Sequence, residues 1–207
     1  MADRPTLLVI GGPNGSGKTT VLSFLQRAGR EIPDYANADE IAKMLPGDLH
    51  ERNIQSQRIV RTRRDAAIDA YASFSYETVM SHHSHVDAMV KARDLGFFVQ
   101  LVFVTTDDPQ INVQRVANRV REGGHDVPTD RIINRYHRIF KDTLFDAIAT
   151  ADEAMLFDTT RGNTMARPQF VAHIRGWHVT VKDPEGLSWP VSLLARMQAD
   201  IRFVFGA

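Results

Sequence analysis

A glycine-rich segment directly after a short apolar run is the feature that most constrains this chain. The run Thr6–Ile10 is typical of a strand buried on both faces of a parallel sheet. Next comes Gly12-Pro13-Asn14-Gly15-Ser16-Gly17-Lys18-Thr19, which matches G-x-x-x-x-G-K-[ST] at every fixed position. Helical spacing follows, with Val21, Leu22, Leu25 and Ala28 on one face. Strand, loop and helix in this order predict a phosphate-binding loop (the P-loop, Gly12–Thr19).

Each fixed residue of the P-loop has a chemical reason. The glycines allow consecutive backbone N–H groups to turn inward around phosphate oxygens, and the following helix points its positive end at them. Lys18 can reach the β- and γ-phosphates, and the Thr19 hydroxyl is a ligand suited to Mg²⁺. We therefore predict ATP and Mg²⁺ as cofactors, with Thr19 on the metal. The predicted nucleotide-binding residues are Gly12, Pro13, Asn14, Gly15, Ser16, Gly17, Lys18, Thr19 and Thr20.

The rest of the chain alternates between apolar runs and helical patterns. Strands are expected at Tyr35–Ala38, Phe74–Glu77, Phe97–Thr105, Ala154–Phe157 and within Phe170–Val181. Helices are expected at Gly17–Ala28, Glu40–Leu45, Leu49–Ala72, Val86–Leu95, Ile111–Arg121 and Thr129–Ala149. This alternation predicts an α/β P-loop NTPase fold, with a parallel sheet flanked by helices. The 207 residues suit a single domain over residues 1–207, with 181–207 as a C-terminal extension of ambiguous pattern.

Composition narrows the function classes. Lys plus Arg and Asp plus Glu both number 25, so the net charge is zero and a wrapped nucleic-acid partner is not expected. The chain has no cysteine, which excludes disulfides, thiolate metal sites and cysteine nucleophiles. No segment approaches the roughly 20 apolar residues of a membrane span, and the first residues lack a leader pattern. We therefore expect a cytoplasmic protein without a membrane partner.

Other missing motifs favour a small-molecule kinase among P-loop proteins. The sequence has neither the guanine-reading Asn-Lys-x-Asp of GTPases nor the Leu-Ser-Gly-Gly-Gln of ABC-type ATPases. A kinase needs a carboxylate for the acceptor hydroxyl, a second acidic group near the strand ends and a mobile cationic lid. Candidates exist for all three.

Asp39 and Glu77 are the candidate carboxylates. Each follows or ends an expected strand, where ligands gather in open α/β sheets. Asp39 could accept the proton of a substrate hydroxyl, or it could merely cap the helix expected to begin at Glu40. Glu77 could bind substrate or organise magnesium-bound water, or it could be an ordinary acid at a strand end. Asp107, Asp108 and Asp158 each remain candidates for a second magnesium-directing acid.

Four arginines flank a glycine-rich loop and form the candidate lid. Arg115 and Arg119 precede Gly123-Gly124, and Arg131 and Arg135 follow Pro128, each pair one helical turn apart. A lid over about residues 119–135 could close on the triphosphate and stabilise the developing charge. Alternatively, the first pair could simply stabilise the C-terminal end of its helix through the helix dipole, and the second pair could lie on a solvent-exposed helix face.

Three histidines, His82, His83 and His85, resemble a metal cluster. Magnesium prefers oxygen ligands, however, and Ser84 with Asp87 three residues later resembles a helix N-cap. We expect these histidines to be surface residues.

Together these segments resemble the zeta-toxin family of P-loop kinases. The resemblance rests on the P-loop, Asn37-Ala38-Asp39-Glu40-Ile41, Tyr76-Glu77-Thr78, Gly96–Val104, Arg119–Pro128 with its Gly-Gly-His-Asp-Val-Pro, and Arg135-Tyr136. It spans about residues 6–160. This chain departs from the family pattern at two places. Val79-Met80 stands where Thr-Leu is more usual, and Asp158-Thr159-Thr160 stands where Asp-Asn-Ser is common. Both lie near strand ends, so they bear on substrate choice.

The resemblance implies an ATP-dependent kinase that phosphorylates a sugar hydroxyl of UDP-N-acetylglucosamine, and a possible antitoxin partner. It implies Asp39 as catalytic base and Glu77 with Thr78 as substrate contacts. Lys18, Arg119 and Arg135 would act on the phosphates, with Arg131 also binding nucleotide. Two alternatives remain: a kinase of another small hydroxyl metabolite or antibiotic, and a non-catalytic ATP-binding partner protein.

Overall fold

One β-sheet runs through the part of the chain that the structure describes. The computed structural model describes residues 4–161, 169–175, 178–181, 189, 193 and 202–203. Within these, the strand order is β2-β3-β1-β4-β5-β6-β7-β8. The strands are β1 (Thr6–Gly11), β2 (Tyr35–Ala36), β3 (Phe74–Thr78), β4 (Phe98–Thr105), β5 (Glu153–Asp158), β6 (Gln169–Arg175), β7 (His178–Val181) and β8 (Arg202–Phe203). Strands β1 to β5 pair in parallel, which confirms the predicted α/β fold class.

The C-terminal part of the sheet differs from the prediction. One strand is expected within Phe170–Val181, but this region holds two, β6 and β7. Strand β6 pairs antiparallel with β5, and β7 pairs antiparallel with β6. An antiparallel pair does not need the crossover connection that a parallel pair requires. Most of the extension 181–207 lies outside the described residues.

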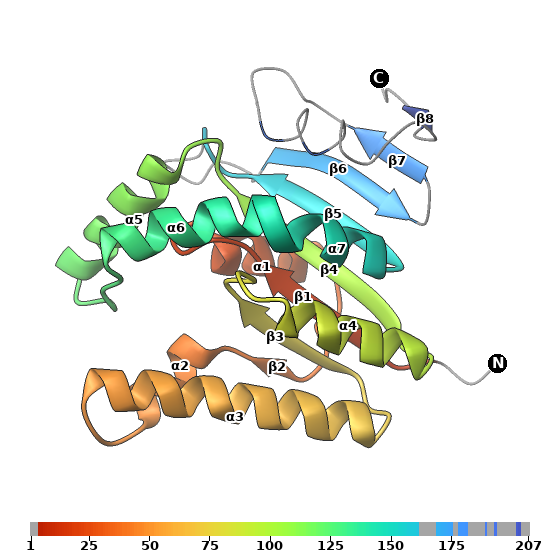
Figure 1. Cartoon of the computed structure of the whole chain (residues 1–207), viewed down its shortest axis with the longest axis horizontal. Helices are drawn as coiled ribbons and strands as arrows, with labels where there is room; N and C mark the ends of the chain where they lie inside the picture. Colours follow the sequence, from red (N-terminus) through yellow and green to blue (C-terminus); the bar gives the residue numbers. More distant parts are fainter. Residues whose placement is uncertain are drawn as a thin grey trace.

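Helices cover both faces of the sheet (Figure 1). They are α1 (Lys18–Arg27), α2 (Ala38–Met44), α3 (Leu49–Asp69), α4 (Ser84–Asp94), α5 (Pro109–Arg121), α6 (Thr129–Arg138), the π-helix η1 (Ile139–Thr143) and α7 (Leu144–Thr150). The long helix expected over 129–149 is therefore α6 and α7 with a π turn between them. Within that turn the Thr143 hydroxyl donates to the Met80 carbonyl oxygen at 2.6 Å, which fixes the loop after β3. No helix among the described residues combines the length and apolarity that a bilayer crossing requires.

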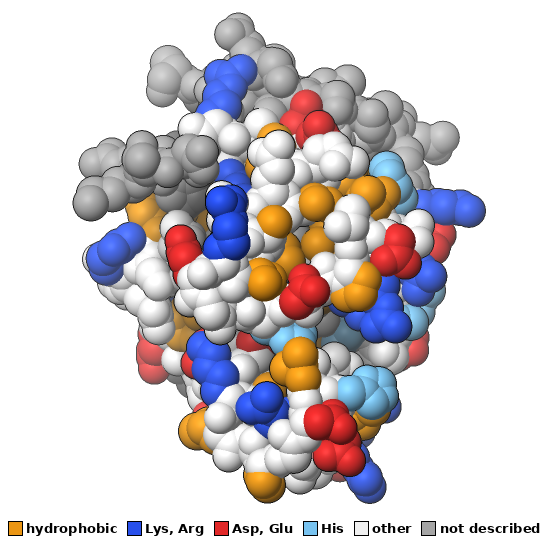
Figure 2. Space-filling model, turned by 90° about the vertical axis from the view of Figure 1, so that its left-hand side faces the viewer, with side chains coloured by type: hydrophobic (Ala, Val, Ile, Leu, Met, Phe, Trp, Pro, Cys, Tyr) orange, Lys and Arg blue, Asp and Glu red, His pale blue; other side chains and the backbone are white. Residues whose placement is uncertain are grey.

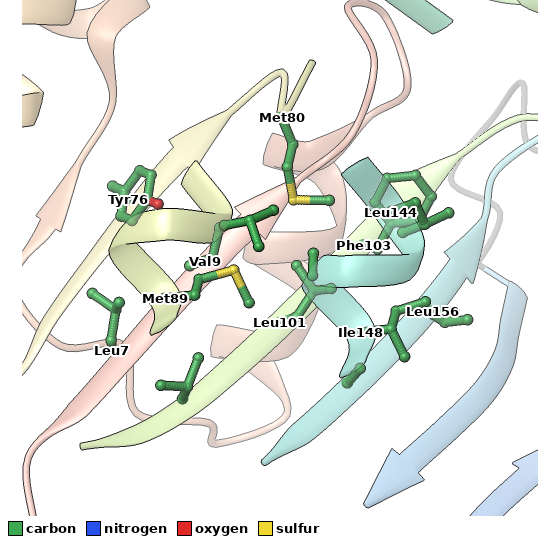
Figure 3. Close-up of a cluster of buried hydrophobic side chains, with 14 of the residues drawn as sticks. Leu7, Val9, Tyr76, Met80, Met89, Leu101, Phe103, Leu144, Ile148 and Leu156 are labelled. Atoms are coloured by element: carbon green, nitrogen blue, oxygen red, sulfur yellow. The ribbon is translucent and has the colours of Figure 1, made fainter. Parts of the chain in front are cut away.

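Alternating strand residues build the two cores. Leu8 and Ile10 of β1 pack with the α1 side chains Val21, Leu22 and Leu25. Leu7 and Val9 face the opposite side, where Figure 3 shows them with Met89 of α4 and with Leu144 and Ile148 of α7. Because both faces of β1 are covered, its sequence is apolar without a break, as the opening run predicted.

Local capping positions the helices of the site. The Asn37 side chain accepts hydrogen bonds from the Asp39 and Glu40 amides and caps α2. The idea that Asp39 caps this helix is therefore wrong, because the helix begins one residue before it. The carboxyl ends of β1, β3 and β4 meet at one edge of the sheet, to the left in Figure 1, beside the starts of α1, α2 and α5. The predicted site residues come from these segments.

Candidate functional site

The P-loop wraps around its own lysine. The Lys18 ammonium donates to the carbonyl oxygens of Gly12 at 2.9 Å and Pro13 at 3.0 Å. Burial lowers the pKa of Lys18, and the nearby carboxylates of Glu77 and Asp39 oppose that shift. Gly17 has a φ of 84° and leads directly into α1. The loop thus holds a cation and a helix N-terminus at one point, as a phosphate site requires.

Two glycines of the loop have no room for a side chain. A Cβ at Gly12 would lie 2.0 Å from the Val104 carbonyl oxygen, and one at Gly15 would lie 2.6 Å from that of Asn112. The loop is therefore packed against the end of β4 and the start of α5. The Ser16 hydroxyl inside it is buried and has no hydrogen-bond partner among the described residues. This unpaired donor and the enclosed lysine fit an anionic ligand such as a triphosphate.

Glu77 faces the lysine from the end of β3. Its Oε1 lies 3.8 Å from Lys18 Nζ, and both side chains are nearly buried. Its Oε2 accepts hydrogen bonds from the Tyr35 hydroxyl at 2.9 Å and from Asn37 Nδ2 at 3.1 Å. Burial raises the pKa of Tyr35, and the Glu77 charge raises it further, so the phenol stays a donor. The sequence interpretation missed Tyr35 and Asn37 because their spacing to Glu77 arises through sheet pairing.

Asp39 is an exposed carboxylate near Lys18. It sits in the first turn of α2, and its carboxylate is 4.0 Å from Arg119 Nη1 of the lid. Its side chain is 53% exposed, so the carboxylate remains accessible to a substrate. The structure thus brings Lys18, Asp39, Glu77 and Arg119 together from four separate segments. Side chains of both charges and histidines lie on this edge of the molecule (Figure 2).

The lid is a small packed unit of its own. Val116 of α5, Val127 of the loop and Ile132 of α6 form a separate apolar cluster. Arg119 Nη2 donates to the His125 carbonyl oxygen at 2.8 Å, and a Cβ on Gly124 would lie 2.5 Å from Arg119 Cγ. The Gly-Gly-His segment therefore folds directly onto Arg119. His125 Nε2 also lies 3.3 Å from Asn53 Nδ2 of α3, which joins the lid to the opposite side of the site.

Of the second pair of candidate lid arginines, Arg131 and Arg135, it is Arg135 that contacts the P-loop. Arg135 Nη1 donates to Asn14 Oδ1 at 3.2 Å. Burial lowers the pKa of Arg135, and the neighbouring Arg131 and Arg138 lower it further. Arg131 itself is exposed, near enough to influence Arg135. The structure thus joins Arg135 to the phosphate loop.

Arg115 and Thr159 form a contact that the sequence did not single out as a pair. Arg115 donates to Thr159 Oγ1 at 2.8 Å and to the Thr159 carbonyl oxygen at 2.6 Å. The Thr159 hydroxyl in turn donates to the Ser16 carbonyl oxygen at 2.8 Å. The segment after β5 therefore braces the P-loop from the side opposite Glu77.

The three candidate magnesium-directing acids have other partners. Asp108 caps α5 through the Gln110 amide, with Pro109 at the first helical position. The buried Asp158 accepts hydrogen bonds from the Thr160 amide at 2.7 Å and from Trp189 Nε1 at 2.8 Å. The Trp189 amide lies 3.4 Å from Asp107 Oδ1. Thr19 and Thr20 are exposed at the start of α1, and Thr19 is the residue of the loop that fits Mg²⁺.

Thr78 contacts His85, the one of the three histidines whose position differs from the expectation. The Thr78 hydroxyl is 2.9 Å from His85 Nε2 and accepts the Met80 amide at 3.0 Å. His85 is largely buried against the Tyr76 ring, so it is not a surface residue as expected, whereas His82 and His83 are exposed. Helix α4 starts at Ser84 without a side-chain cap, so the expected Ser84 cap does not form. No metal-binding group of three His, Asp or Glu side chains exists in the described part of the chain.

The chain is similar to a known protein family and to a sequenced relative. The family model described as "Zeta toxin" matches residues 1–163. An uncharacterized protein of Haemophilus influenzae is 32% identical over 126 residues, which cover 60% of this chain and 88% of that protein.

Solved structures share the fold at low sequence identity. A chain of the PezAT chromosomal toxin–antitoxin system of Streptococcus pneumoniae has a TM-score of 0.57 at 15% identity, covering 81% of this chain and 72% of that one. AvrRxo1-ORF1:AvrRxo1-ORF2 with ATP has a TM-score of 0.55 at 18% identity, covering 100% and 67%. The protein has the fold and the P-loop of ATP-using kinases, and it belongs to the zeta-toxin family.

Proposed function

We propose that the protein is an ATP- and Mg²⁺-dependent kinase that phosphorylates a sugar hydroxyl of UDP-N-acetylglucosamine or a related nucleotide sugar. The observation that carries the proposal is the convergence of Lys18, Asp39, Glu77 and Arg119 beside the P-loop. A buried cation for the donor phosphates lies next to an accessible carboxylate for the acceptor. Binding of nucleotide alone would not require that carboxylate.

The proposed reaction is transfer of the γ-phosphoryl group of ATP to the sugar hydroxyl. The Asp39 carboxylate accepts the proton of the sugar hydroxyl, whose oxygen then forms the new bond to the γ-phosphorus. The bond between the γ-phosphorus and the bridging oxygen breaks, and ADP leaves. Lys18, Arg119 and Arg135 offset the negative charge that develops on the phosphoryl oxygens. Mg²⁺, held by the Thr19 hydroxyl, would neutralise charge on the β- and γ-phosphates.

The acceptor side of the proposal depends on Glu77 and on family membership. Glu77 is held at Oε2 by Tyr35 and Asn37, so its position is fixed before any ligand arrives. A carboxylate fixed in this way accepts hydrogen bonds from sugar hydroxyls without reorganising. Thr78 shapes the same strand end through its bonds to Met80 and His85.

The experiment is phosphoryl transfer from ATP to a panel of nucleotide sugars, read by mass spectrometry. We expect one acceptor to gain a single phosphate in the wild type, and the Asp39→Ala variant to lose 10²–10⁴-fold in kcat, roughly the share of a general base. Glu40→Ala, on the next residue of α2, is the matched control. Absence of a phosphorylated sugar from the whole panel would refute the acceptor assignment. ATP binding with equal biological activity in Asp39→Ala would favour a non-catalytic partner protein.

We further propose an inhibitory protein partner, because AvrRxo1-ORF1:AvrRxo1-ORF2 and the PezAT system are described as complexes or toxin–antitoxin systems. Induced expression of the wild type in a bacterial host should arrest growth, and Asp39→Ala should not. Growth arrest that persists in Asp39→Ala would separate toxicity from phosphoryl transfer.

A further inference from the structure

A buried asparagine outside the predicted site holds the outer turn of the P-loop. Asn112, the fourth residue of α5, is fully buried. Its Nδ2 donates to the Asn14 carbonyl oxygen at 2.8 Å, and its Oδ1 is hydrogen-bonded to the Thr106 hydroxyl after β4. One side chain therefore joins three segments: the P-loop, the end of β4 and the first helix of the lid.

The contact includes the backbone of α5 as well as the side chain. A Cβ on Gly15 would lie 2.6 Å from the Asn112 carbonyl oxygen and 3.2 Å from its Cα. The P-loop thus approaches α5 so closely that residue 15 has to be glycine. Gly15 has a φ of 76°, which glycine also tolerates best.

The second lid helix meets the same residue of the P-loop. Arg135 of α6 donates to Asn14 Oδ1, while Asn112 binds the backbone oxygen of that residue. Tyr136, next to Arg135, donates through its hydroxyl to the Thr106 carbonyl oxygen at 2.7 Å. Asn14 and Thr106 are therefore each held by both lid helices.

We propose that Asn112 is a positioning residue of the nucleotide site. Asn112 binds the backbone carbonyl oxygen of Asn14 and keeps the P-loop against the start of α5. It thereby positions the side chain of Asn14, whose Oδ1 Arg135 contacts. The inference rests on the proposed use of ATP and not on the identity of the acceptor.

The test measures binding of a non-hydrolysable ATP analogue with Mg²⁺ by isothermal titration calorimetry. Asn112→Ala removes the donor to Asn14 without adding a charge, and leaves that part-buried carbonyl oxygen without this hydrogen bond. We expect its affinity for the analogue to fall by at least about fivefold. Asn118→Ala is the matched control, because Asn118 is an exposed asparagine on the same helix. Its affinity should stay within about twofold of the wild type.

A double-mutant cycle separates positioning from general destabilisation. If Asn112 acts through Asn14 on Arg135, the Asn112→Ala/Arg135→Ala protein should lose less affinity than the product of the two single losses, by at least about threefold. Additive losses would overturn the proposal, as would an Asn112→Ala protein that binds like the wild type. If Asn112→Ala does not fold, Asn112→Ser replaces it in the cycle, because a hydroxyl there is too short to reach Asn14.

The acceptor proposal can fail independently. If the wild type binds the analogue but phosphorylates no sugar, the proposed acceptor is refuted. The double-mutant cycle on Asn112 can still be measured, because it depends only on binding of the analogue. A wild type that does not bind the analogue refutes both proposals.

Discussion

The Lys18 ammonium lies 3.8 Å from the Glu77 carboxylate, and both groups are nearly buried beside the P-loop. Glu77 therefore offsets part of the cost of burying the lysine before a triphosphate binds. In the proposed reaction, the phosphates of ATP compete with Glu77 for Lys18, which frees the Glu77 carboxylate to bind the acceptor.

Glu77→Gln should separate donor from acceptor binding. Loss of the negative charge removes a repulsion toward the phosphates, so we expect ATP affinity within about threefold of the wild type or tighter. The KM for the acceptor should rise by about tenfold or more, because a charged hydrogen-bond acceptor is lost. Steady-state kinetics with each substrate varied in turn measures both values. A tenfold loss confined to ATP would contradict the assignment of Glu77 to the acceptor.

Tyr35→Phe should loosen Glu77 with little change in shape. The Tyr35 hydroxyl donates to Glu77 Oε2 at 2.9 Å, and its removal should cost about 1 kcal/mol of unfolding free energy. Tyr71→Phe is the control, because Tyr71 is 53% exposed. Chemical denaturation measures the stability, and kcat/KM for the acceptor should fall in Tyr35→Phe alone. Equal behaviour of the two variants would show that the hydroxyl does not hold Glu77.

Gly15→Ala and Gly29→Ala form a matched pair. Both glycines have positive φ values, 76° and 84°, so each substitution costs about 1–2 kcal/mol of backbone strain. A Cβ at Gly29 meets no atom within 4 Å, whereas one at Gly15 meets the Asn112 carbonyl oxygen at 2.6 Å. Nucleotide affinity should therefore collapse in Gly15→Ala and persist in Gly29→Ala. Isothermal titration calorimetry with the ATP analogue measures the affinity of both variants. Retained binding in Gly15→Ala would rule out the close packing described above.

The stability of the protein should fall as the pH drops from 7.5 to 5. Burial lowers the pKa of His85 from 6.5 to about 4. Between these values the unfolded chain binds the proton and the folded chain does not, so unfolding becomes easier as pH falls. The contribution of His85 at pH 5 is a loss of about 2 kcal/mol relative to neutral pH.

Denaturation of His85→Gln measures that contribution. Its unfolding free energy should depend less on pH over this range than that of the wild type. The His50→Gln variant alters an exposed histidine on α3 and should keep the wild-type dependence. An unchanged pH dependence in His85→Gln would show that another group is responsible.

Local patterns in the sequence predicted the P-loop, the parallel strands and the convergence of Asp39, Glu77 and Arg119 at one edge. Such features depend on short spacings or on the rule that parallel strand ends meet. The partners of Glu77 and of Asn14 could not be predicted, because Tyr35, Asn112 and Arg135 reach them through pairing and packing between distant segments. The position of His85 could not be predicted, because Ser84 with Asp87 suggested a helix N-cap at the surface, whereas His85 packs against the Tyr76 ring and contacts Thr78.

The bond between Trp189 and Asp158 has a consequence for where the protein can be cut. The family match ends at residue 163, yet Trp189 donates to the buried Asp158, and Val171, Ala172 and Ile174 of β6 belong to the main core. A fragment of residues 1–163 would leave a buried carboxylate without its indole donor and β5 without its antiparallel partner β6. The family match is therefore shorter than the packed core of this chain, to which β6 and Trp189 contribute.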